Sequence, residues 1–296
     1  MAQSENPFAA RELFKPRRVA IIATRFFDDG NNLAPTYTID AKMLSPEDAT
    51  QPVATALLFI HGASGPSKDP RITYAPFQDE LEFQGKGQDK IASVVYNSLG
   101  VGSDNQEFYN EQSLINRADN ALNALFYTYN TLHPQNIIIS AVSMGASDAA
   151  LALAKLYDIA TDPSHPRSSE ALQIIPLIKG VVLFGPAAYT RDVQNLPARD
   201  QNQTRTKMLR ESAAHPEELI AQSHTLMYWK ILSRRYPLYV LYGKEDSVIP
   251  KQVQDAYREL AMLTDTVPYS PHDGLLGSKY RAYHEKVISW MKSLIA

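Results

Sequence analysis

Short aliphatic runs alternate along this chain with longer segments of helical period, and this alternation is the feature that most limits its fold. Five of the runs are apolar at almost every position: Ala56–Ile60, Ile91–Tyr96, Ile137–Ala141, Gly180–Phe184 and Leu238–Tyr242. Strands that are apolar on both faces are typical of the centre of a parallel sheet, which helices cover on both sides. The alternation therefore predicts an α/β fold with a mostly parallel, twisted sheet and helices on both of its faces.

Three further strands are expected to complete a sheet of eight. Val19–Thr24 and Tyr37–Met43 come first, and the second of them alternates apolar with polar side chains. That alternation is typical of an antiparallel edge strand with one face in water, so we expect these two strands to form a leading hairpin. A short strand near Thr264–Val267 comes last.

Two segments carry an apolar stripe at helical spacing. The first stripe is Leu114, Ala118, Leu122, Leu125 and Tyr129, and the second is Tyr280, Tyr283, Val287, Met291 and Leu294. Such stripes are more typical of helices packed on a sheet than of binding grooves, and we interpret both in that way.

The length of 296 residues and the 44% hydrophobic content suit a single domain with one sizeable core, spanning residues 1–296. We expect residues 1–16 to be disordered. Residues 186–237, between the sixth and seventh strands, are more numerous than one crossover helix needs and predict a small lid. Within them Met227, Tyr228 and Trp229 could line an apolar site, but core packing is the favoured interpretation and they receive no role.

Charge and residue content exclude several functions. The net charge is −3 without long runs of one sign, so we expect no nucleic-acid partner. The absence of cysteine excludes disulfides, thiolate metal sites and a cysteine nucleophile. The sequence contains no His-Glu-x-x-His spacing, and we expect neither a metal nor an organic cofactor. Without a secretory signal or a run of about 20 apolar residues, we expect a cytoplasmic protein with no membrane span.

A serine follows the strand Ile137–Ala141, in the segment Ala141-Val142-Ser143-Met144-Gly145. Small residues lie two positions away on each side of Ser143, as a sharp and strained strand-to-helix turn requires. The segment resembles the G-x-S-x-G nucleophile elbow of the α/β-hydrolases, which implies that Ser143 is a nucleophile. Ala141 stands where that motif has its first glycine, and one methyl group is the smallest possible departure.

Two other strand ends resemble the same family. The strand Ala56–Ile60 runs into His61-Gly62-Ala63-Ser64-Gly65, which is similar to the family's His-Gly turn. The resemblance implies an oxyanion hole made by the backbone N–H groups of Ala63 and Met144, with His61 in a structural role. Asn97–Ser103 is similar to the glycine-rich turn after the fourth strand. No Lys-Ser or Lys-Thr pair follows its glycines as in a P-loop, so we do not expect nucleotide binding.

The acid and the base follow from the resemblance of two later segments. Tyr242–Pro250 resembles the family's Gly-x-x-Asp turn, which implies Asp246 as the acid, with the adjacent Glu245 in reserve. His272 lies in a loop before the last helix and is the implied base. The order Ser, Asp, His is the order of this family.

The resemblance spans roughly Val19 to Ala296 and implies a serine hydrolase that cleaves a carboxylic ester or thioester of a small molecule. Ser143, His272 and Asp246 would form the catalytic triad and pass through an acyl-enzyme. Two alternatives remain open at this point. The scaffold could serve an acyltransferase, a C–C bond hydrolase or a peptidase, or it could be a non-catalytic binding protein.

Overall fold

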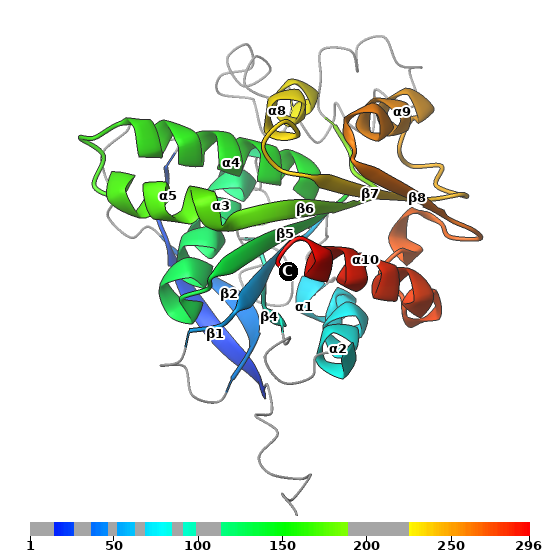
Figure 1. Ribbon diagram of the computed structural model, residues 1–296, viewed down its shortest axis with the longest axis horizontal. Coiled ribbons are helices and arrows are strands. Elements are labelled where there is room, and N and C mark those ends of the chain that lie inside the picture. Colours follow the sequence, from blue (N-terminus) through cyan, green and yellow to red (C-terminus); the bar gives the residue numbers. More distant parts are fainter. Residues whose placement is uncertain are drawn as a thin grey trace, which may run out of the picture.

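The computed structural model describes residues 15–26, 37–46, 52–62, 69–84, 91–98, 114–188 and 225–296. Within these residues, eight strands form one sheet in the order β1-β2-β4-β3-β5-β6-β7-β8 (Figure 1). The strands are β1 (Lys15–Ala23), β2 (Tyr37–Ser45), β3 (Thr55–Ile60), β4 (Ile91–Tyr96), β5 (Asn136–Val142), β6 (Ile178–Phe184), β7 (Leu238–Gly243) and β8 (Leu263–Val267). The predicted eight-stranded, mostly parallel sheet is therefore confirmed.

The leading hairpin is also present, but one detail of its prediction is wrong. β1 and β2 pair antiparallel, and β2 pairs antiparallel with β4, so β2 lies inside the sheet and β1 is its edge. Ile39, Ala41 and Met43 of β2 are buried, whereas Thr38 is exposed and Asp40 is half-buried. The alternation of β2 thus arises because one face of this interior strand is buried and the other is only partly covered. Side-chain periodicity depends on burial and not on whether another strand lies alongside.

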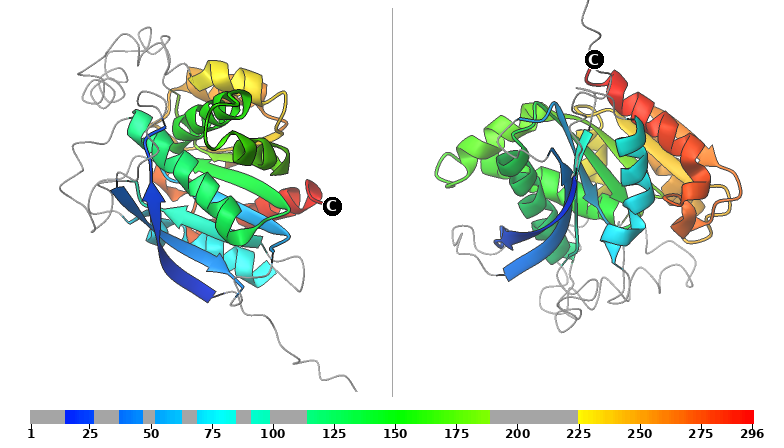
Figure 2. Two further views of the ribbon diagram at one scale, coloured as in Figure 1. Left: turned by 90° about the vertical axis from the view of Figure 1, so that its left-hand side faces the viewer. Right: turned by 90° about the horizontal axis from the view of Figure 1, so that it is seen from below.

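The helices of the described residues cover both faces of the sheet (Figures 1 and 2). They are α1 (Pro70–Thr73), α2 (Ala75–Gln84), α3 (Leu114–Leu132), α4 (Gly145–Thr161), α5 (Ser168–Ile174), α8 (Thr225–Leu232), α9 (Lys251–Leu260) and α10 (Arg281–Ser293), with short 3-10 turns η3 (Ile175–Leu177), η5 (His272–Gly274) and η6 (Ser278–Tyr280). Among the described residues, no helix is long and apolar enough to span a bilayer.

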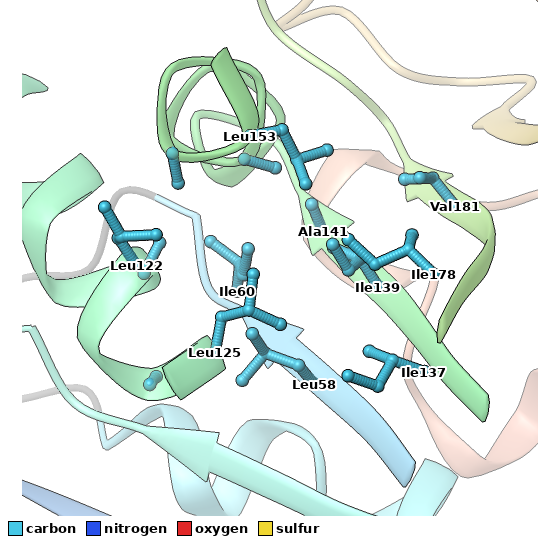
Figure 3. Close-up of a cluster of buried hydrophobic side chains, with 14 of the residues drawn as sticks. Leu58, Ile60, Leu122, Leu125, Ile137, Ile139, Ala141, Leu153, Ile178 and Val181 are labelled. Carbon is cyan, nitrogen blue, oxygen red and sulfur yellow. The ribbon is translucent and has the colours of Figure 1, made fainter. Parts of the chain in front are cut away.

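Alternate side chains of the central strands pack into two separate cores, one on each face of the sheet. Ala56, Leu58 and Ile60 of β3 pack with residues of α3, α4, α5, α8 and α9. Leu57 and Phe59 point to the opposite face and pack with α2 and α10. Figure 3 shows the first core, in which Leu122 and Leu125 of α3 and Leu153 of α4 lie over β3, β5 and β6. Burial on both faces explains why these strands are apolar throughout.

Both predicted stripes lie largely on packed faces. Ala118, Leu122 and Leu125 of α3 are buried, as are Val287 and Met291 of α10. The ends of the second stripe fall outside the helix, since Tyr280 belongs to η6 and Leu294 follows α10. α3 also buries polar side chains that its apolar periodicity did not reveal: Arg117, Asp119, Asn120 and Asn123.

The segment predicted as a lid contains one element that packs on the main body. Trp229 of α8 is fully buried, and its Nε1–H donates to the carbonyl of Ala146 in α4 at 3.0 Å. The favoured core role is therefore correct for Trp229, whereas Met227 is exposed. Residues 189–224 lie outside the described residues, and the lid stays a prediction. At the N-terminus, β1 includes Lys15 and Pro16, so the last two residues of the segment expected to be disordered belong to the sheet.

Candidate active site

Ser143 occupies the sharp turn between β5 and α4 in a backbone conformation that serine rarely adopts. Its φ is +52°, in the left-handed region. The backbone bonds of its neighbourhood hold it there, because its N–H donates to the Phe184 carbonyl at 2.9 Å and its carbonyl accepts from Ala187 N–H at 3.0 Å. Backbone strain of this kind persists only where the surroundings impose it, and it is concentrated at functional sites.

The two positions that flank Ser143 carry small residues for different structural reasons. A Cβ atom on Gly145 would lie 2.5 Å from the Ile60 carbonyl oxygen, so no side chain fits at that position. Ala141 is fully buried, and its methyl group lies in the core beside Ile60 and Ile139 (Figure 3). The alanine at the first flank is therefore accommodated by core packing.

The structure brings the three predicted triad residues into one chain of hydrogen bonds. The Oγ of Ser143 lies 2.8 Å from Nε2 of His272, and Nδ1 of His272 lies 2.8 Å from Oδ2 of Asp246. The side chain of Asp246 is fully buried, and that of His272 is only 8% exposed. The three residues follow β5, β7 and β8, at the carboxyl edge of the parallel strands where ligands of such sheets bind.

The contacts of Asp246 decide the proton positions along this chain. Its Oδ1 accepts from the backbone N–H groups of Val248 at 2.9 Å and Ile249 at 3.1 Å. An ionised carboxylate only accepts, so Nδ1 of His272 carries the proton that it shares with Oδ2. Nε2 then holds a lone pair and accepts the hydroxyl proton of Ser143. The reserve acid Glu245 is exposed.

Two glycines lie close to the histidine, and of these only Gly243, the glycine of the predicted Gly-x-x-Asp turn, was identified from the sequence. Gly185, directly after β6, has a φ of +51°, and a Cβ there would lie 3.0 Å from Nδ1 of His272. A Cβ on Gly243 would lie 2.1 Å from the Ser270 carbonyl oxygen. Both glycines let backbone approach the loop that carries His272. The position of Gly185 directly after the apolar strand β6 is the sequence signal that could have identified it.

One of the two predicted oxyanion donors lies among the described residues. Met144 is the N-cap of α4. The first N–H groups of a helix have no acceptor within it, and the helix dipole favours negative charge at this end. Gly62 lies in close contact with the serine, since a Cβ on it would lie 2.9 Å from Cβ of Ser143. Ala63 lies outside the described residues.

His61 joins the ends of β3 and β4. Its Nδ1 donates to the Gly62 carbonyl at 2.7 Å, and its Nε2 accepts from Ser98 N–H at 2.9 Å. Burial, reinforced by the charge of Arg117, lowers the pKa of His61 to about 3. The neutral imidazole satisfies both backbone groups, in agreement with a structural role.

The segment after β6 is braced by buried tyrosines that the sequence analysis missed. The Tyr242 hydroxyl donates to the Pro186 carbonyl at 3.0 Å, and the Tyr257 hydroxyl donates to the Ala187 carbonyl at 2.9 Å. Burial raises the pKa of both hydroxyls, so both remain protonated donors. Among the described residues, no group of three or more His, Asp or Glu side chains is placed to hold a metal ion.

The sheet order, with a serine turn after β5, an aspartate after β7 and a histidine after β8, defines the α/β-hydrolase fold. This chain has that fold, as predicted. It is similar to the peroxisomal α/β-hydrolase of Saccharomyces cerevisiae, with 12% identity and a TM-score of 0.62 over 96% of this chain and 90% of that chain. It is also similar to a thermostable carboxyl esterase from Bacillus coagulans, with 11% identity and a TM-score of 0.61 over 95% and 99% of the two chains.

A third similar structure belongs to a longer protein. The acylaminoacyl peptidase of Pyrococcus horikoshii shares 14% identity with a TM-score of 0.61 over 95% of this chain but only 42% of its own. This chain thus spans less than half of that peptidase. No protein-family model and no curated protein sequence matches this chain. At such low identities the likeness establishes the fold alone, because one fold hosts many unrelated reactions.

Proposed function

We propose that this protein is a serine hydrolase that cleaves a carboxylic ester or thioester of a small molecule through an acyl-enzyme on Ser143. The observation that carries the proposal is the continuous hydrogen-bonded chain from Ser143 through His272 to the buried Asp246, which begins at a strained residue between a strand and a helix. A nucleophile, a base in contact with it and an acid that orients the base are the parts that acyl transfer needs.

In the first half of the reaction, the Ser143 oxygen attacks the substrate carbonyl while its proton passes to Nε2 of His272, 2.8 Å away. The imidazolium that forms is stabilised by Asp246 through the bond at Nδ1. The carbonyl oxygen becomes negative, and the N–H groups of Met144 and Ala63 would donate to it at the N-terminus of α4.

The tetrahedral intermediate then collapses to the acyl-enzyme. The bond from the carbonyl carbon to the leaving oxygen or sulfur breaks, and the leaving group takes the proton from Nε2 of His272. Water repeats the sequence, giving its proton to His272 and its oxygen to the acyl group. The bond between the acyl carbon and Oγ of Ser143 then breaks, Oγ takes the proton back from His272, and the acid leaves, so each cycle consumes one ester and one water.

The first experiment compares hydrolysis of p-nitrophenyl acetate, butyrate and octanoate by wild type and Ser143→Ala. Ser140→Ala is the matched control: this serine precedes the turn in β5, is buried, and its Oγ has no hydrogen-bond partner in the described structure. We expect turnover by wild type and the control, a loss of several orders of magnitude in Ser143→Ala, and fluorophosphonate labelling that requires Ser143. Equal activity in all three proteins would remove Ser143 from the mechanism.

Product analysis distinguishes the related activities. Added alcohols or amines that divert most of the acyl group from water would indicate an acyltransferase, and faster cleavage of acylated peptides than of esters would indicate a peptidase. A folded protein that neither turns over activated esters nor reacts with the fluorophosphonate would contradict the hydrolase proposal and leave a binding function.

A further inference from the structure

Arg117 of α3 and Asp148 of α4 form an ion pair in the interior of the protein. Nη2 of Arg117 lies 2.6 Å from Oδ2 of Asp148, and each side chain is only 1% exposed. Buried ion pairs are weak sources of stability, because desolvating two charges offsets most of their attraction and apolar replacements are often as stable. The pair therefore calls for an explanation other than stability.

The arginine reaches the turn beside the proposed nucleophile. The same Nη2 atom donates to the carbonyl of His61 at 2.8 Å and lies 3.2 Å from the carbonyl of Gly62. These two residues directly follow β3. A charged donor makes a stronger hydrogen bond than a neutral one, so Arg117 fixes both carbonyls in direction.

Fixing the direction of a carbonyl also fixes the direction of the N–H group in the same peptide unit. The Gly62 carbonyl belongs to the peptide whose nitrogen is that of residue 63. Because a trans peptide is planar, its C=O and N–H point in opposite directions. In a trans peptide, a Gly62 carbonyl held towards Arg117 would direct this N–H away from Arg117, and the proposed mechanism assigns the N–H to the oxyanion.

The aspartate fixes the arginine to the helix of the nucleophile. Asp148 lies in the first turn of α4, which starts two residues after Ser143. The turn and this helix are in tight contact, because a Cβ on Gly145 would lie 2.7 Å from the His61 carbonyl oxygen and one on Gly62 would lie 3.0 Å from the Val142 carbonyl oxygen. The ion pair of Arg117 and Asp148 thus links the turn after β3 to the helix that follows Ser143, and close backbone contacts join the two at the site.

We propose that Arg117 and Asp148 are positioning residues that hold the turn after β3 against the nucleophile and align its amide for stabilisation of the transition state. The inference rests on the function proposed above. Neither side chain touches the reacting atoms. Their removal lowers kcat and leaves substrate affinity in place, because an oxyanion donor contributes more to the transition state than to the bound substrate.

The decisive variant is Arg117→Met with Asp148→Leu, which removes both charges and keeps apolar volume at each position. Apolar replacement of a buried ion pair is often neutral for stability, but the carbonyls of His61 and Gly62 lose their donor, so we expect a folded protein with a modestly lower Tm. At pH 8 we expect kcat for p-nitrophenyl butyrate to fall about 10- to 100-fold, with KM within about threefold of wild type. A trifluoromethyl ketone, which adds to the serine and places an oxyanion in the hole, should lose affinity by the same factor as kcat.

Two further variants separate positioning from stability. Arg117→Lys keeps the charge but not the fork of donors, and we expect a smaller fall in kcat. Asn123→Leu, on the same helix, removes hydrogen bonds to Thr24 at the edge of the sheet and does not touch the turn after β3. It should lower Tm and leave kcat unchanged. If kcat follows Tm across all these variants, or if the double variant is folded and fully active, the proposal is wrong.

Hydrogen exchange provides a readout that does not depend on turnover. We expect faster amide exchange in the peptide that covers residues 58–68 of the double variant, with the peptides of β6 and β7 unchanged. Unchanged exchange at 58–68 would overturn the positioning role. If wild type fails both to hydrolyse esters and to react with the fluorophosphonate, the proposed function fails, while the exchange experiment still decides whether the pair holds the turn.

Discussion

Nε2 of His272 lies 2.8 Å from Oγ of Ser143, although 129 positions separate the two residues in the chain. The contact arises because β5 and β8 run parallel in one sheet, so the segments that follow them emerge at the same edge. Gly185 and Gly243 then allow the backbone to approach closely enough for the imidazole to reach the serine.

Replacement of the acid should impair chemistry far more than binding. In Asp246→Asn the bonds from Val248 and Ile249 can keep the side chain in place, but an amide can present an N–H to Nδ1 and favour the wrong tautomer of His272. We expect kcat for p-nitrophenyl butyrate to fall about 10⁴-fold with little change in KM. The matched control is Glu245→Gln, which should remain fully active because Glu245 is exposed. A loss confined to the Glu245 variant would transfer the role of the acid to that residue.

Ala141 can be tested as a core residue in a catalytic motif. Ala141→Gly restores the family's first glycine, but it removes a buried methyl group and loosens a strand. We expect the free energy of unfolding in urea to fall by about 1–2 kcal/mol, with kcat unchanged. A gain in kcat would mean that the methyl group constrains the turn, contrary to the packing seen in the core.

The pH dependence of stability should reveal the buried imidazole of His61. Its pKa is about 3 in the folded protein and about 6.5 in the unfolded chain. Between these two pKa values the unfolded chain binds a proton that the folded protein does not. The free energy of unfolding is therefore highest above about pH 6.5 and falls as the pH is lowered towards 3. The slope from this group is up to about 1.4 kcal/mol per pH unit.

The comparison that isolates this effect uses His61→Gln, which does not titrate. Burial raises the pKa of Asp148 to about 6. Protonation of Asp148 therefore increases the free energy of unfolding as the pH falls, opposite to the effect of His61 over part of the same pH range. Asp148 is present in both proteins, so its contribution cancels in the difference. We expect the stability advantage of wild type over His61→Gln to shrink between pH 6.5 and 4 in urea unfolding. Parallel curves would show that His61 carries the same charge in both states.

Trp229 and Met227 should respond differently to the same truncation. Trp229→Ala removes a fully buried ring and its hydrogen bond to the Ala146 carbonyl, and we expect a loss of about 3–5 kcal/mol of stability. Met227→Ala changes an exposed side chain, and we expect a change within about 0.5 kcal/mol. Thermal or urea unfolding checks both values. A strongly destabilised Met227→Ala would indicate that this side chain is covered in solution.

The sequence by itself determined the strands and the order of the chemical groups. Burial on both faces imposes an apolar run on each central strand, so β3 to β7 could be predicted from the apolar runs in the sequence. The resemblance of the turns around Ser143, Asp246 and His272 pointed to residues that the structure brings together. Both signals are local, because each concerns a few consecutive residues.

Tertiary structure decided what depends on residues distant in sequence. The position of β2 inside the sheet could not be predicted from its alternation, because a neighbouring strand bonds to its backbone and leaves no mark on its side chains. The ion pair of Arg117 and Asp148 lies on two helices whose apolar periodicity gives no sign of buried charge. Whether a polar side chain is buried depends on which partner the fold brings to it, and that partner is set only when the helices pack on the sheet.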